Sequence, residues 1–294
     1  MNPFPRPGPL CPRESSDHLG HYARVDHSED AFIAFKQAVP DGAGLARRGR
    51  VVLAVGGSGC GKTSLMHRCA HWLQEQAPGD PRVIIADLTA DDRRGADTEQ
   101  RVRHICARLS DELEGEGLFG AEQLAALRDR RDDPYQALPV LSKYLGNEKV
   151  VVAVLLPPSD LAEEVLRFAE LARKNVLFFA ETAYDHVAEQ CARRLGPGSP
   201  APIDQLRVGL LDVEDGWRYV HHHLARQPDL AVPAITEQTM RRVMEKRVSG
   251  AGGMTVKELQ TLLHGIFQEA LDRPVQALEF RDFADYYIRS ARLI

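Results

Sequence analysis

The sequence lacks a long apolar run and has few cysteines. No uncharged stretch within its 294 residues approaches the roughly 18 apolar residues that a helix needs to cross a bilayer, and the first residues lack the apolar core of a signal peptide. We therefore expect no membrane span and a cytoplasmic protein. The cysteines show no C-x-x-C spacing, which argues against a structural zinc site and against a disulfide framework. Reduced thiols are expected at all five positions, 11, 60, 69, 106 and 191.

An excess of positive charge is also missing. The formal net charge is −5, so no overall basic field indicates nucleic acid or an anionic membrane. Arginines do gather between positions 101 and 131, but acidic residues are interspersed among them, which favours a solvated surface of mixed charge. DNA stays a candidate partner that the charge does not indicate. The arginines in question are Arg101, Arg103, Arg108, Arg128, Arg130 and Arg131.

One stretch matches the phosphate-binding pattern G-x-x-x-x-G-K-[ST] at every position. An apolar run at 51–55 precedes it and a segment that can form a helix, 63–76, follows it, so the pattern has the strand–loop–helix context that it requires. The alternative is a glycine-rich turn that precedes a helix by chance, and the agreement on both flanks argues against it. The predicted nucleotide-binding residues are Gly56, Gly57, Ser58, Gly59, Cys60, Gly61, Lys62, Thr63 and Ser64.

The residue types of this loop suit a triphosphate bound with Mg²⁺. Its glycines let successive backbone N–H groups point into one concavity at the start of a helix. Lys62 would reach the β- and γ-phosphates, and the Thr63 hydroxyl would bind the Mg²⁺ that bridges them. Ser64 fits a helix residue better than a phosphate contact.

Five apolar segments, most of them rich in β-branched residues, alternate with helical segments. This alternation predicts an α/β fold with a doubly wound parallel sheet of about five strands. Right-handed crossovers would place the phosphate loop at the carboxyl edge of the sheet, where ligands bind. The expected strands are 51–55, 83–86, 150–156, 176–180 and 205–211, and the expected helices are 29–39, 63–76, 98–113, 121–129, 160–174 and 184–194.

The two ends of the sequence differ from this α/β region. Prolines at 3, 5, 7, 9 and 12 predict an extended arm or a disordered lead. From about Glu214 onward the strands stop, and four helices are expected. We therefore predict a proline-rich arm at 1–28, a phosphate-loop α/β domain at 29–213 and a helical, lid-like domain at 214–294. The four helices are expected at 214–226, 236–248, 255–272 and 279–290.

The complete phosphate loop, the five α/β units and the small helical domain together resemble the AAA+ ATPases, especially their STAND-like and origin-recognition-like branches. The resemblance covers roughly residues 30–294, and its one specific motif is 56–64. It implies ATP and Mg²⁺ as cofactors, and homo-oligomers or a protein partner as the assembly. The lack of an obvious N-K-x-D motif, which reads guanine, agrees with ATP.

The sequence departs from these ATPases at the Walker B motif. There the third strand ends in acidic residues that hold magnesium and polarise the attacking water. Here Pro157 and Pro158 follow the strand, and the nearest carboxylate is Asp160. Asp160 is thus a candidate catalytic acid; the alternative is a helix N-cap, with Glu163 completing a capping box. Asp87, at the end of the second strand, is a second candidate, and its alternative is a solvated strand end.

The resemblance implies roles for residues around the fourth strand. In these ATPases that strand ends in a polar residue that orients water, which makes Thr182 the candidate and Glu181 a candidate base; the alternative for both is exposure to solvent. The following helix ends in an arginine that reaches the γ-phosphate bound by a neighbouring subunit. Arg193 and Arg194 stand there, and either also fits an ordinary surface cation near a helix C-terminus.

Other family contacts have only loose counterparts. The lead-in over the adenine usually contains a Gly-Arg pair, which region 17–22 lacks. The family's Gly-x-Pro-Arg corresponds to 252–257, where Lys257 substitutes loosely because an ammonium lacks the guanidinium fork. Histidines 221–223 are consecutive, so on a helix they point in different directions and do not converge on one metal ion.

We interpret the protein as an AAA+ or STAND-type switch, in which bound ATP sets the arrangement of the α/β and helical domains and hydrolysis is weakened by the atypical Walker B motif. One alternative is a small-molecule kinase or other phosphotransferase that uses Asp87, although no lid segment with clustered arginines is evident. Another is a DNA-associated AAA+ regulator, against which the acidic total weighs. A scaffold with a vestigial loop comes last, because the Lys62-Thr63 pair is intact.

Overall fold

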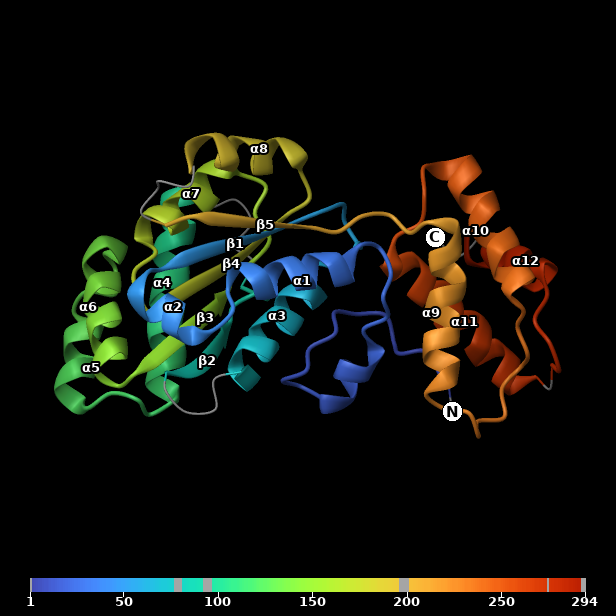
Figure 1. The fold of residues 1–294 in the computed structure, drawn as a ribbon, viewed down its shortest axis with the longest axis horizontal. Helices are drawn as coiled ribbons and strands as arrows, with labels where there is room; N and C mark the ends of the chain where they lie inside the picture. The colour runs from blue at the N-terminus through green and yellow to red at the C-terminus, as the bar shows by residue number, and fades with distance from the viewer. Residues whose placement is uncertain (1, 77–80, 92–96, 196–200, 274, 292–294) are drawn as a thin grey trace. The chain divides into compact units, whose positions relative to one another are not determined.

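The computed structural model describes residues 2–76, 81–91, 97–195, 201–273 and 275–291 (Figure 1). The chain divides into two compact units, which we call the sheet unit and the helical unit. The sheet unit comprises Asp30–Gly56 and Lys62–Arg207. The helical unit comprises Met1–Glu29, Gly57–Gly61 and Val208–Ile294. The central residues of the phosphate loop therefore belong to one unit, whereas the strand and the helix that flank them belong to the other.

The sheet unit is built on five parallel strands in the order β2-β3-β4-β1-β5. This confirms the doubly wound α/β fold and places β1 beside β4, with Val55 opposite Thr182 at their carboxyl ends. Every residue of β3 and β4 is buried, as expected for parallel strands covered on both faces. The strands are β1 (Arg50–Val55), β2 (Arg82–Asp87), β3 (Val150–Leu155), β4 (Val176–Thr182) and β5 (Ile203–Arg207).

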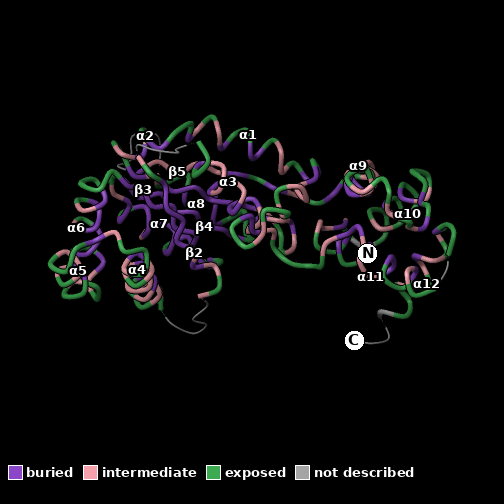
Figure 2. Tube along the Cα trace, turned by 90° about the horizontal axis from the view of Figure 1, so that it is seen from below, coloured by how far each residue is buried: buried purple, intermediate pink, exposed green. Residues whose placement is uncertain are grey.

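Helices cover both faces of this sheet. On one face, Phe178 of β4 lies against Phe168, with ring centroids 5.2 Å apart. On the other face, Phe179 meets Phe35, which also contacts Trp72. Figure 2 shows the buried residues concentrated in the sheet and in the helix faces turned toward it. The helices are α1 (Ser28–Ala38), α2 (Gly42–Arg47), α3 (Lys62–Gln76), α4 (Thr98–Gly115), α5 (Ala121–Arg128), α6 (Pro134–Asn147), α7 (Ala162–Leu171) and α8 (Asp185–Arg194).

Two of these helices were not anticipated from the sequence. Helix α6 contains Pro139 in its interior, which interrupts the sequence signal for a helix, yet Asp133 caps its first turn and Leu138, Leu141 and Leu145 are buried. Burial of this apolar stripe outweighs the lost backbone hydrogen bond. Helix α2 has only six residues, too few to show a periodic pattern.

The helical unit contains four α-helices in its C-terminal part, as predicted. The N-termini of the first three are defined by side chains that accept backbone hydrogen bonds, namely Asp212, Thr236 and Thr255. Their apolar faces form one core that includes Met240, Leu263 and Phe283. The helices are α9 (Val213–Ala225), α10 (Glu237–Ala251), α11 (Val256–Asp272) and α12 (Phe280–Ala291), and the unit also holds a short 3-10 helix, Ser16–His21.

The N-terminal segment, expected as an extended arm or a disordered lead, instead packs into the helical unit. Phe4 is 1% exposed, and its ring centroid lies 4.7 Å from that of Phe267 on α11. Asn2 donates to the carbonyl of His264, and His264 contacts the carbonyl of Phe4 in turn. The prolines do prevent a regular α-helix, but they leave single apolar side chains free to be buried, which composition alone does not reveal.

In the described parts of the chain, no helix is both long and apolar enough to cross a bilayer.

Candidate nucleotide site

The phosphate loop connects β1 to α3 through residues 56–61. Gly59 and Gly61 have φ angles of 81° and 82°, in the left-handed region that glycine adopts without strain. Lys62 is buried at the start of α3, and its ammonium donates to the carbonyl of Gly56 at 2.8 Å. The lysine side chain is therefore bonded to the first residue of the loop.

Within the helical unit, the first turn of α11 lies directly on this loop. The backbone N–H of Lys257 donates to the carbonyl of Gly59 at 3.1 Å. A methyl group added at Gly59 would lie 3.0 Å from the Thr255 hydroxyl, and one added at Gly61 would lie 3.3 Å from Val256. Both glycines thus lie close to α11, and their positive φ angles would strain any other residue at these positions. This contact is made by the backbone of Lys257; that its ammonium substitutes for an arginine sensing the γ-phosphate stays a prediction.

Asp26 is a second neighbour of the loop that sequence reasoning missed. It is 3% exposed, and one of its carboxylate oxygens lies 3.6 Å from the position of a methyl group on Gly61. Burial, with a smaller contribution from the nearby Asp215 carboxylate, raises the pKa of Asp26 to about 7, although hydrogen bonds from Ser28 oppose the shift. No periodic pattern marks this residue, because it lies in the turn before α1 and has a φ of 52°.

The carboxylate of Glu181 contacts Thr63, the residue predicted to bind Mg²⁺. In the sheet unit, Glu181 accepts a hydrogen bond from the Thr63 hydroxyl at 2.8 Å, although 118 residues separate the two. Burial has the largest influence on the pKa of Glu181 and raises it. The hydrogen bond from Thr63 and the charge of the Lys62 ammonium lower this pKa. The sequence left two interpretations of Glu181, a catalytic base or a residue exposed to solvent. The second is wrong, since Glu181 is 5% exposed.

Thr182, the next residue, is also buried, so exposure to solvent is wrong for it as well. Its carbonyl accepts the backbone N–H of Gly56 at 3.2 Å, which ties the end of β4 to the start of the loop. Its hydroxyl accepts from the N–H of Tyr184. Thr182 therefore fixes the backbone at this edge.

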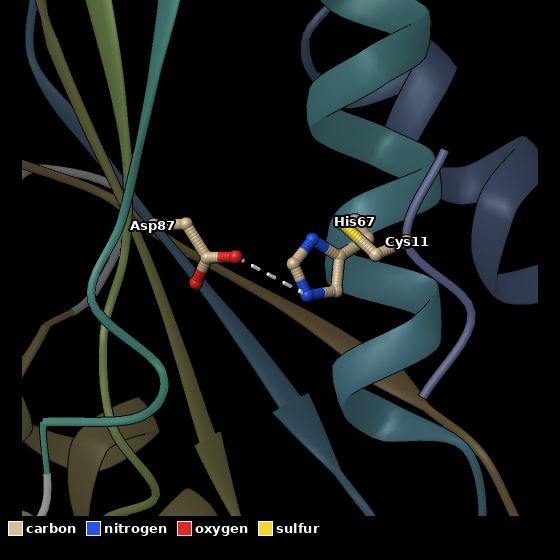
Figure 3. A group of neighbouring side chains, drawn as sticks. All are labelled: Cys11, His67 and Asp87. Atoms are coloured by element: carbon tan, nitrogen blue, oxygen red, sulfur yellow. Dashed lines mark ion pairs between the residues drawn. The ribbon is translucent and has the colours of Figure 1, made fainter. Parts of the chain in front are cut away.

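Asp87 has partners of its own at the end of β2. It accepts hydrogen bonds from the backbone N–H and the hydroxyl of Thr89 at 3.1 and 2.7 Å. Another of its oxygens lies 3.7 Å from Nε2 of His67 on α3, as Figure 3 shows. Asp87 is thus held by Thr89 and His67, whereas Glu181 is the carboxylate bonded to Thr63.

Asp160 is exposed, and the capping role considered for it is wrong. Helix α7 starts later than expected: its N-cap is Leu161, which makes no side-chain cap. Ser159 takes the structural role at this turn. Its hydroxyl donates to the buried Glu164 at 2.7 Å, and its N–H donates to the carbonyl of Glu181 at 2.9 Å. The Asp160 side chain is exposed to solvent, so it neither caps α7 nor packs into the core.

Arg193 and Arg194 end α8 and are both exposed. Arg193 lies 3.9 Å from Glu189, one turn earlier. No carboxylate among the described residues lies within ion-pair distance of Arg194, which leaves its guanidinium the more available of the two.

The arginines between 101 and 131 are engaged with carboxylates, as the mixed-charge reading predicts. Arg101, for example, lies 3.2 Å from the buried Glu164, and Arg108 lies 3.1 Å from Asp91. The others pair with Glu99, Glu114, Asp129 and Asp132.

No protein-family model matches the sequence, and no curated protein matches it. Solved structures do resemble it. The ORC1 protein of Aeropyrum pernix, in complex with DNA, aligns with a TM-score of 0.57 and 13% identity, covering 92% of this chain and 66% of that one. The ORC2 protein of the same organism, in ADPNP–ADP complexes, aligns with a TM-score of 0.55 and 15% identity, covering 88% and 66%. The chain thus spans 66% of the length of each, and at these identities the likeness concerns the fold.

Proposed function

We propose that this chain, which has the fold of the AAA+ P-loop ATPases, is an ATP-dependent switch in which Glu181 supplies the carboxylate that the third strand lacks. The observation that carries the proposal is the 2.8 Å hydrogen bond from Thr63 to Glu181 beside a complete phosphate loop. We propose both that the chain is of the STAND-like type and that it acts as a switch. ATP and Mg²⁺ fit the residues present, because the loop offers backbone N–H groups to phosphates and Thr63 offers oxygen to a hard cation.

The geometry of Thr63 suits metal binding. A hydroxyl has one hydrogen to donate and two lone pairs to offer. Because its hydrogen is directed at Glu181, its lone pairs are left for Mg²⁺. Glu181 therefore fixes the rotamer of Thr63, and its carboxylate would supply negative charge to a cation bound there.

The acidity of Glu181 suits a proton acceptor. Burial raises its pKa, which makes its carboxylate more basic than that of an exposed glutamate, and a base is most effective when its pKa lies nearer the working pH. Hydrolysis would then depend on an acid from β4, beside β1, in place of one from β3. We expect turnover to be slow, so that bound ATP persists as a signal.

The test is phosphate release from ATP, with nucleotide affinity measured on the same samples. Glu181→Gln should lower turnover about 100-fold, the scale of a lost general base, while binding changes little. Glu164→Gln is the matched control, because Glu164 is also a buried glutamate with hydroxyl and arginine partners. Lys62→Ala should abolish binding. Turnover that survives in Glu181→Gln but disappears in Asp87→Asn or Asp160→Asn would overturn the assignment.

We propose further that Arg194 acts on the nucleotide of a neighbouring copy. The support is its exposure at the end of α8 and the absence of a described carboxylate partner. Arg194→Ala should lower turnover by about 1000-fold or more, and Arg193→Ala, which loses only a pairing with Glu189, should not. Mixing Arg194→Ala protein with Lys62→Ala protein should restore part of the activity, because some mixed interfaces combine an intact loop with an intact arginine. No recovery on mixing would contradict action between subunits.

The kinase alternative has less support, because Asp87 is held by Thr89 and His67. It predicts transfer of phosphate to an acceptor in place of water, which a measurement of ATP consumption beside phosphate release would detect as consumption without release of free phosphate. A DNA-associated role would appear as binding to a duplex that weakens steeply with salt.

A further inference from the structure

A pocket at the amino end of the sheet gathers lysines. It has a volume of about 510 Å³ and lies entirely within the sheet unit. Lys143, Lys149 and Lys174 line it, together with Asn147 and Asn175. Among the described residues that line it, none is acidic. Three lysines therefore line one hollow, and the described part of its wall holds no carboxylate.

The choice of residue type is unusual for this chain. The sequence contains thirty arginines and only seven lysines, yet three of the seven lysines line this pocket, and none of the lining residues that the structure describes is an arginine. Lysine carries a compact charge on a flexible stem, so several lysines can converge on one small, multiply charged anion, whereas the planar guanidinium favours flat bidentate partners. The composition of the wall thus indicates a compact polyanion.

The turns that carry two of these lysines are fixed. Lys149 and Asn175 each precede a strand, β3 and β4, and both have left-handed φ angles, 53° and 68°. The carbonyl of Lys149 accepts the N–H of Arg82, while the carbonyl of Lys174 accepts the hydroxyl of Ser142 at 2.8 Å. The lysine stems therefore start from anchored backbone.

The floor of the pocket is equally well fixed. Asn175 is 3% exposed; its side-chain amide donates to the carbonyl of Ser142 and its backbone N–H donates to that of Leu45 in α2. Ala43 and Ala46 of the same helix also line the pocket. Position 149 has a left-handed φ, which a glycine would adopt without strain. The presence of lysine there is therefore explained better by a role of its side chain than by the needs of the turn.

We propose that this pocket binds a compact polyanion carrying two or more phosphate groups. The pocket is separate from the nucleotide site, because the phosphate loop follows the carboxyl end of β1, and six residues of parallel strand place the two edges roughly 20 Å apart. The phosphates can belong to a free small molecule or to successive units of a nucleic-acid backbone. The chemistry of recognition is the same in both cases.

The experiment uses inorganic pyrophosphate as the probe, in calorimetric titrations of the full chain carrying Lys62→Ala, so that the phosphate loop does not contribute. Pyrophosphate should bind, and each of Lys143→Gln, Lys149→Gln and Lys174→Gln should weaken it by about fivefold or more, as expected for loss of a charge-assisted hydrogen bond. Lys36→Gln and Lys246→Gln are the matched controls outside the pocket and should bind as before. No binding, or equal binding by the triple lysine variant, would overturn the proposal.

A further variant separates binding from folding. Lys149→Gly should raise or preserve the melting temperature, since it relieves the left-handed backbone, and still weaken pyrophosphate binding. A variant that is more stable yet binds pyrophosphate as well as the parent would contradict a role for this lysine in recognition.

A second arm identifies the source of the phosphates. A duplex oligonucleotide that competes with pyrophosphate, and loses affinity in the triple variant, would assign the pocket to nucleic-acid backbone. Pyrophosphate binding without competition by the duplex would assign it to a free small molecule.

Discussion

Replacing Asp26 with asparagine should stabilise the helical unit, and the gain should grow with pH. Asp26 is buried beside the phosphate loop, next to Asp215, whose carboxylate accepts the backbone N–H of Asp26 at 3.2 Å. Asparagine keeps the shape of the side chain and an oxygen that can accept from the N–H of Ser28. It also tolerates the left-handed backbone at this position. The substitution therefore removes mainly the ability to ionise.

The size of the effect follows from two pKa values. Asp26 keeps its proton up to a pKa of about 7 in the native protein, whereas an aspartate in an unfolded chain loses its proton at about 3.9. Between these values the native state binds more protons than the unfolded state, so the free energy of unfolding falls as pH rises. At about 1.4 kcal/mol per pH unit, the penalty in the wild type is about 1.5 kcal/mol at pH 5 and about 4 kcal/mol at pH 8.

The assay is urea unfolding at pH 5, 6, 7 and 8, followed by the fluorescence of Trp217, which lies on α9 of the same unit, in proteins that carry Trp72→Phe to remove the signal of the sheet unit. The stability difference between Asp26→Asn and wild type should increase by about 2.5 kcal/mol across this range and level off above pH 7. Asp229→Asn, at an exposed position of the same unit, is the control and should show no such trend. A difference that stays constant from pH 5 to pH 8 would refute the assignment of a buried, late-ionising carboxyl to Asp26.

Three further outcomes are expected. Asp26→Asn should also bind ATP more tightly than wild type above pH 7, measured by titration, because an ionised carboxylate near Gly61 repels phosphates; equal affinities would contradict this. Phe4→Ala should lower the free energy of unfolding by about 3 to 5 kcal/mol in urea titrations, since the ring is enclosed by Tyr219, His223 and Phe267. Gly59→Ala should cost about 1 to 2 kcal/mol and weaken ATP binding, through its positive φ and the 3.0 Å approach to Thr255. Gly57→Ala, whose added methyl group would lie at an ordinary 3.5 Å from Cys60, is its control.

Local sequence patterns were enough to predict the framework. The five strands were visible as short apolar runs, and the phosphate loop as a motif with fixed spacing, because both depend on neighbouring residues. The four C-terminal helices were visible for the same reason, and their observed ends differ from the expected ones by three residues at most. The strand expected at 205–211 is shorter and earlier, Ile203–Arg207.

The site could be predicted only in part, because its contacts join distant residues. Glu181 was one of several candidate acids, and only the extension of β4 to Thr182, in register with β1, brings it to Thr63. Asp26 carries no periodic or motif signal, and its burial depends on the packing of the helical unit around the loop. The lysine pocket is formed by four separate stretches between 43 and 175, so no window of sequence contains it.

The packing of the N-terminal segment onto α11 has a consequence for biosynthesis. Asn2 and His264 are 262 positions apart, so the ribosome completes every residue of the sheet unit before the partner of Asn2 exists. At about 5 to 20 residues per second, Phe4 waits for many seconds without its cover, a period in which a chaperone has access to it. Gly57–Gly61 belongs to the same late-forming unit. A nascent chain therefore acquires a finished phosphate loop only when its last helices emerge.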